Sequence, residues 1–168
     1  MKLRPATRRD AAGIATLHAA SWRSAYRDVL PARRLGPALD DDRRRRWRTM
    51  LARARPRDVV LVADDGAKLL GFIAVWARPR RAYIDNLHVD PARRGQGIGE
   101  QLMREAARRL ARTGQRETYL WVYMANQAAI RFYARLGGRP DGRAFDRFLR
   151  SQAPCQRMAW RRFERLAF

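Results

Sequence analysis

The chain contains little cysteine, little lysine and no long apolar run. Its one cysteine, Cys155, cannot form an internal disulfide, and such cysteine usage agrees with a reducing compartment. No segment approaches the roughly 20 apolar residues that a helix needs to cross a bilayer, and the stretch from Met1 to Pro5 lacks the apolar core of a signal peptide. The sequence therefore predicts a cytoplasmic protein with no membrane among its partners.

Lysine occurs only at Lys2 and Lys68, so arginine supplies nearly all the positive charge of a chain whose formal net charge is +21. A chain this basic is a candidate for binding nucleic acid, because cations neutralise the phosphate backbone. The arginines are spread through every segment, however, and a compositional bias of the source genome gives the same pattern. The four arginines at 43–46 follow three aspartates and are predicted to form a solvated helix face. We therefore expect nucleic acid to bind only non-specifically, at low salt.

The length and the apolar pattern indicate one domain, spanning residues 1–168. Alternating apolar residues predict strands, and apolar residues three or four positions apart predict helices. Strands are expected at 59–63, 69–77, 82–89, 117–123, 144–149 and 157–161, and helices are expected to begin after Asp10, after Asp40, at Gly99 and at Asn126. Strands before and after helices in one chain indicate an α/β sandwich with a mixed sheet.

The strand expected at 82–89 carries polar residues on both faces. Strict alternation places Tyr83, Asp85, Leu87 and Val89 on one face and Ile84, Asn86 and His88 on the other. His88 then points away from Asp85 and is expected to serve mainly as a packing residue.

A glycine-rich turn follows this strand and precedes a helix. Residues 93–99 read Arg-Arg-Gly-Gln-Gly-Ile-Gly. The first amides of a helix have no intrahelical partner and lie at the positive end of its dipole, so they converge on an anion. Glycine lets the backbone approach a phosphate or adopt a left-handed dihedral. The spacing fits neither the Rossmann fingerprint nor a Walker A loop, and a plain tight turn remains the alternative.

A second block supports the phosphate-binding interpretation. After the strand at 117–123 come Asn126, Ala129, Phe132, Tyr133 and Gly137. Together with Leu87, Val89, Asp90, Pro91, Arg94, Gly97 and Gly99, these residues resemble the cofactor-binding core of the GNAT superfamily of acyl-CoA-dependent N-acetyltransferases, over roughly residues 69–138. The amino-terminal part, with Trp22 and Tyr26 after a short amphipathic helix, is similar to a common bacterial branch of that superfamily.

The resemblance implies a fold and an activity. The fold is of the α/β (α+β) class, with a mixed, mostly antiparallel central sheet of six to seven strands and helices on both faces. Acceptor-side helices fall at about 10–55 and the cofactor core at about 69–138. The implied reaction transfers an acetyl group from acetyl-CoA to a primary amine of a small molecule or peptide, by direct attack in a ternary complex and without a metal. A non-catalytic acyl-CoA-binding or nucleic-acid-binding protein on the same fold is the alternative, and a homodimer is compatible with either.

The resemblance also assigns roles to residues. The amides of Arg94, Gly95, Gln96, Gly97, Ile98 and Gly99 would bind the pyrophosphate of coenzyme A, and the strand segment Leu87, His88 and Val89 would pair with its pantetheine arm through backbone groups. Asn126 would cap its helix and reach the same arm.

The chemical step is assigned to two residues. Tyr133 would protonate the departing thiolate, with a buried aromatic as the alternative. Asp85 is the expected general base, although a normal carboxyl needs burial for that role. Trp22 and Tyr26 would line the acceptor pocket or pack in the core.

Overall fold

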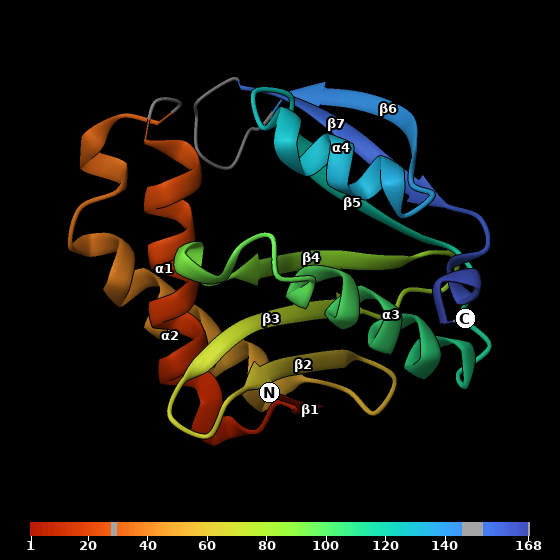
Figure 1. The fold of residues 1–168 in the computed structure, drawn as a ribbon, viewed down its shortest axis with the longest axis horizontal. Helices are drawn as coiled ribbons and strands as arrows, with labels where there is room; N and C mark the ends of the chain where they lie inside the picture. The colour runs from red at the N-terminus through yellow and green to blue at the C-terminus, as the bar shows by residue number, and fades with distance from the viewer. Residues whose placement is uncertain (28–29, 146–152, 168) are drawn as a thin grey trace.

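The computed structural model describes residues 1–27, 30–145 and 153–167 and shows a seven-stranded sheet with helices on both faces (Figure 1). The strands are β1 (Lys2–Pro5), β2 (Val59–Asp64), β3 (Leu69–Trp76), β4 (Ala82–Val89), β5 (Thr118–Tyr123), β6 (Arg139–Phe145) and β7 (Pro154–Trp160), and the α-helices are α1 (Ala11–Tyr26), α2 (Ala38–Arg53), α3 (Ile98–Ala111) and α4 (Gln127–Arg135). The sheet order is β1-β2-β3-β4-β5-β7-β6. All neighbouring strands are antiparallel except β4 and β5, which confirms the expected mixed, mostly antiparallel sheet.

The predicted elements in the middle of the chain are confirmed within one or two residues, and those at the sheet edges differ more. The short edge strand β1 was not expected, because its residues show no apolar alternation and it ends in Pro5. The strand expected at 144–149 is found earlier, at 139–145, and positions 146–149 lie outside the described residues. Helix α2 begins at Ala38 rather than after Asp40.

The sheet separates two apolar clusters. On one face, Leu61 and Ile73 of the sheet pack with Leu102 of α3; on the other, Phe72 packs with Ile14 of α1 and Trp47 of α2. Among the described residues, no helix is long and apolar enough to span a membrane.

A β-bulge interrupts β4 at Asp85. Ala74 of β3 pairs with Asn86 and the next residue, Val75, pairs with Ile84, so Asp85 has no partner on β3. One extra residue shifts the alternation of side chains by one position. Ile84 and Leu87 consequently pack in the same cluster, on the α3 side. The expected strict alternation along 82–89 is therefore wrong beyond Ile84.

Strands β4 and β5 pair only at their first residues and then diverge. The parallel ladder joins Ala82 to Thr118 and Tyr83 to Tyr119, and no further pair continues it among the described residues. Figure 1 shows the two strands forming a V that opens toward α1. The second half of β4 therefore presents an unpaired edge toward β5, which locates the cleft described next.

Candidate active site

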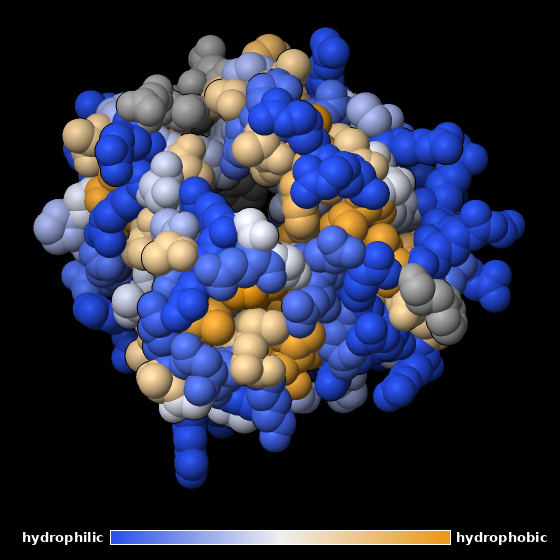
Figure 2. Space-filling model, in the orientation of Figure 1, coloured by the Kyte–Doolittle hydropathy of each residue, from blue (hydrophilic) through white to orange (hydrophobic). Residues whose placement is uncertain are grey.

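A cleft of about 1420 Å³ occupies the gap between β4 and β5, and Figure 2 shows a hollow at the centre of this face. Its walls come from α1, α2, β4, the glycine-rich turn, β5, α4 and β7. The sequence-predicted site residues that line it are Trp22, Tyr26, Asp85, Leu87, His88, Val89, Arg94, Gly95, Gly97, Ile98, Gly99, Asn126 and Tyr133. Gln96 belongs to the same turn but does not line the cleft. The structure thus brings together residues from segments more than 100 positions apart.

The glycine-rich turn has the geometry of an anion site. Gly95 and Gly97 have φ angles of 78° and 76°, in the left-handed region that favours glycine. Helix α3 begins at Ile98, so its first amides have no intrahelical carbonyl to bind. Gly99 is required for a different reason: a Cβ there would lie 3.3 Å from Cζ of Phe132 on α4. The turn therefore keeps free amides directed at the cleft and brings α3 close to α4.

The open edge of β4 offers backbone groups to the cleft. Asp90 donates its amide to the carbonyl of Leu70 at 2.8 Å, so the backbone of Asp90 faces β3. In an antiparallel pair, successive residues alternate between facing the partner strand and facing away. The N–H and C=O groups of Leu87 and Val89 therefore point away from β3, into the gap. The backbone of His88 faces β3, so only its imidazole can contribute to the cleft.

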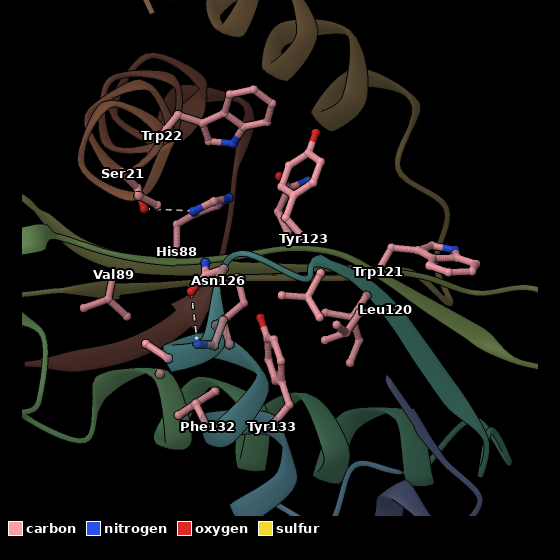
Figure 3. Close-up of a pocket in the computed structure, with 18 of the residues that line it drawn as sticks. Ser21, Trp22, His88, Val89, Leu120, Trp121, Tyr123, Asn126, Phe132 and Tyr133 are labelled. Atoms are coloured by element: carbon pink, nitrogen blue, oxygen red, sulfur yellow. Dashed lines mark hydrogen bonds between the residues drawn. The ribbon is translucent and has the colours of Figure 1, made fainter. Parts of the chain in front are cut away.

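Helix α4 supplies the polar groups on the opposite wall. Asn126 caps the helix, its Oδ1 accepting a hydrogen bond from the amide of Ala129 at 3.1 Å. Tyr133 lies about two helical turns further along α4, with 9 % of its surface exposed. Burial, together with the nearby Tyr26, raises the pKa of the Tyr133 phenol, so the hydroxyl stays protonated at neutral pH. Figure 3 shows its ring rising from α4 toward the strands.

Two stacked histidines lie on the α1 side of β4. The His18 and His88 ring centroids are 4.5 Å apart, and Nδ1 of His88 lies 2.9 Å from Oγ of Ser21 (Figure 3). Nδ1 of His18 accepts a hydrogen bond from Nε1 of Trp47 at 3.0 Å. Burial, followed by the charge of Arg43, lowers the pKa of His88 to about 3, and burial lowers the pKa of His18 well below its usual value. Both imidazoles are therefore neutral at physiological pH. His18 and Ser21 both contact His88, and their i, i+3 spacing on one helix is the sequence signal that could have indicated a shared partner.

Asp85 lies in the cleft but is held by neighbours. Its Oδ2 accepts hydrogen bonds from Nη2 of Arg46 and Nδ2 of Asn86, both at 2.8 Å. Its side chain is 12 % exposed. The bulge turns this carboxylate toward α2, away from the face that Leu87 occupies.

Helix α2 contributes an arginine that sequence reasoning assigned to a solvated face. Arg43 is only 8 % exposed, because it follows Leu39 and precedes Trp47 by four residues each, on the buried face of α2. Its guanidinium carbon lies 4.3 Å from the ring centroid of Trp22. The i, i+4, i+8 spacing was the sequence signal that could have identified it.

Trp22 and Tyr26 form an aromatic wall between α1 and β5. Their ring centroids lie 5.3 Å apart, and the Tyr26 ring lies 5.0 Å from that of Tyr123. Both residues line the cleft while packing on each other.

Comparisons with known proteins agree with this geometry. Residues 19–138 match the model of the Acetyltransferase (GNAT) family. An uncharacterized N-acetyltransferase of Methanocaldococcus jannaschii is 35% identical over 99 residues, covering 55% of this chain and 44% of the relative. The streptothricin acetyltransferase of Streptomyces lavendulae is 41% identical over 86 residues, covering 50% and 45%.

A solved structure has the same fold. The PaiA N-acetyltransferase of Thermoplasma acidophilum, in complex with coenzyme A, superposes with a TM-score of 0.79 at 18% identity, covering 93% of this chain and 96% of that one. The aligned part of this chain spans about half the length of the curated relatives it matches. The family model alone covers well over half of the chain. The protein therefore belongs to the GNAT family of acetyltransferases.

Proposed function

We propose that this protein is an N-acetyltransferase that moves an acetyl group from acetyl-CoA to a primary amine in a ternary complex. The observation that carries the proposal is the open β4 edge at Leu87 and Val89, which lines the same cleft as the start of α3 and Tyr133. A relative named as a putative ribosomal protein bS18-alanine N-acetyltransferase and another named for streptothricin support an amine on a peptide or a small molecule. The lone cysteine agrees with a cytoplasmic location.

The residues present fit coenzyme A. The amides from Arg94 to Gly99 bind the pyrophosphate at the start of α3, where the helix dipole adds to the attraction. The backbone groups of Leu87 and Val89 pair with the amides of the pantetheine arm as a further strand would. The volume of the cleft is large enough for both the pantetheine arm and an acceptor. Bound acetyl-CoA supplies the activated thioester, and no other group is required.

The chain's own groups then assist the transfer. A backbone amide at Leu87 or Val89 polarises the thioester carbonyl as the amine attacks its carbon. Tyr133, kept protonated by burial, donates a proton to the departing sulfur. Asp85, positioned by its hydrogen bond from Arg46, attracts the ammonium form of the acceptor and accepts its proton through water. The neutral His88 leaves the acceptor side without a competing positive charge at that position.

Calorimetric titration with acetyl-CoA tests the cofactor site. We expect one-to-one binding by the wild type, and its loss in Gly97→Asp, because an anion and a side chain would enter the phosphate site. Gly114→Asp is the matched control: Gly114 lies at the other end of α3, with a φ of 77° against 76° at Gly97 and nothing within 4 Å of a Cβ. Because the two substitutions strain the backbone equally, a loss of binding seen only in Gly97→Asp comes from the phosphate site and not from local destabilisation.

Release of free thiol from acetyl-CoA in the presence of a primary-amine panel tests the catalytic part. Binding without any turnover would favour the alternative, a non-catalytic acyl-CoA-binding protein. Unchanged affinity in Gly97→Asp would contradict the assignment of the turn.

A further inference from the structure

Arg43 presents a positive charge to the cleft that its neighbours compensate poorly. Its one ion-pair partner among the described residues is Asp42, 3.5 Å away, and the Asp42 side chain is 56 % exposed. Its buried Nε has no hydrogen-bond partner in the part of the chain that the structure describes. Asp85, the other carboxylate nearby, is already bound by Arg46 and Asn86. Burying a charge without full hydrogen bonding is unfavourable, so a feature of this kind indicates a missing anionic partner.

The guanidinium is also held in place rather than free to reorient. It lies over the Trp22 ring, 4.3 Å from its centroid, a geometry that favours arginine and fixes the plane of its donors. A fixed planar donor set matches a carboxylate or phosphate, which accepts two parallel hydrogen bonds from it.

Arg43 lines the acceptor side of the cleft. It comes from α2, on the opposite sheet face from α3 and α4, and it shares the cleft wall with Trp22, Asp85 and His88. Its guanidinium is close enough to His88 for its charge to lower the pKa of that imidazole, after the larger effect of burial. The phosphates of coenzyme A have their own cations in Arg93 and Arg94, next to the glycine-rich turn. Arg43 is thus available for the second substrate.

We propose that the acceptor is an amine that also carries an oxyanion, a carboxylate or a phosphate, and that Arg43 binds this group while the amine lies between Asp85 and the thioester. This inference rests on the proposed function and narrows it. Neutral amines leave Arg43 without a partner, and polyamines add like charge beside Arg43 and Arg46. The acceptor class is therefore the anionic amines.

Matched acceptor pairs test the inference. Each pair contains an anionic amine and its neutral counterpart: α-amino acids with their amides, dipeptides bearing an acidic side chain with the corresponding amides, and phosphoethanolamine with ethanolamine. Thiol release gives kcat and KM for each member. We expect the anionic member to have a kcat/KM at least about tenfold higher, as for hydrogen bonds to a charged group. The carboxylate and phosphate pairs show which oxyanion is preferred.

Substitution assigns the preference to the residue. Arg43→Gln should remove this preference by raising KM for the anionic member more than for its neutral counterpart, with calorimetric acetyl-CoA affinity unchanged. Arg43→Lys should retain part of it, since lysine keeps the charge without the planar donors. Arg45→Gln is the control, because it removes the same charge from an exposed position of the same helix and should keep the preference. Thermal unfolding checks that each variant folds.

Three results would overturn the inference. Neutral members that react as fast as anionic ones, polyamines as the best acceptors, or a preference that survives Arg43→Gln would each do so while leaving the acetyltransferase activity intact. Absence of acetylation with every amine, despite acetyl-CoA binding, would overturn the proposed function as well.

Discussion

At the scale of single residues, burial decides the charge states in the cleft. His18 and His88 stay neutral because burial penalises the imidazolium, and Tyr133 stays protonated because burial penalises the phenolate. Asp85 and Arg46 form a direct ion pair, with 2.8 Å between Oδ2 and Nη2. The sequence motif could indicate that Tyr133 reaches the cofactor, but only the fold could show that its environment keeps the proton on the hydroxyl. The same holds for Arg43, whose burial depends on packing against Trp22.

Replacement of Tyr133 by Phe tests the proton-donor role. We expect kcat to fall by about 100-fold or more, the range for loss of a general acid, while acetyl-CoA affinity is retained. Tyr119→Phe, on β5 but not part of the cleft wall, should leave kcat unchanged. Because the pKa of Tyr133 is raised, the hydroxyl remains protonated from pH 6 to 9, so the ratio of wild-type to variant kcat should stay constant over that range. A ratio that approaches one by pH 9 would contradict the role.

At the scale of elements, the sequence predicts a feature well when all the residues that define it are contiguous. It does not predict a feature that depends on how two strands pair. The glycine-rich turn and the Asn126 cap lie on the cleft as expected, because each motif is contiguous. The bulge at Asp85 could not be predicted, because an extra residue is visible only against the partner strand β3. That bulge decides which face Asp85 and Leu87 occupy, so the roles proposed for these two residues depend on it.

The junction of α4 and β7 offers a test of how packing positions the cleft. A Cβ at Gly138 would lie 2.6 Å from Cζ2 of Trp160 and 2.9 Å from the carbonyl of Tyr133, so Gly138→Ala must shift the helix end or the strand. We expect it to lower the free energy of unfolding by about 1–3 kcal/mol, as overpacking does, and to lower kcat by displacing Tyr133. Gly36→Ala is the control, since its nearest neighbour would be 3.8 Å away. Urea unfolding measures the free energy of unfolding of both variants, and thiol release measures their kcat. Equal stability of the two variants would show that this junction is loosely packed.

At the scale of the whole molecule, the question is whether a net charge of +21 carries a function of its own. Several arginines are used in ion pairs distributed over the sheet edges and helices, including Arg4 with Asp10 and Asp64, and Arg81 with Glu117 and Asp141. The arginines are spread through every part of the sequence, and Figure 2 shows hydrophilic side chains around the whole outline of the molecule in this view. This distribution favours a solvated, arginine-rich surface. The charge of Arg43 inside the cleft has the separate role proposed above, which is to bind the acceptor.

A titration with a short DNA duplex separates a general electrostatic attraction from a specific site. We expect association at about 50 mM salt that weakens 100-fold or more by about 200 mM, as counterion release predicts for several phosphate contacts. Arg45→Gln should reduce it at least as much as Arg43→Gln, because Arg45 is exposed and Arg43 is buried, whereas only Arg43→Gln should change the acceptor preference. Acetyl-CoA affinity at near-physiological salt should not respond to added duplex. Saturable one-to-one DNA binding that persists at 200 mM salt and competes with acetyl-CoA would instead mean that the cleft serves a nucleic acid, and would remove the basis for an amine acceptor.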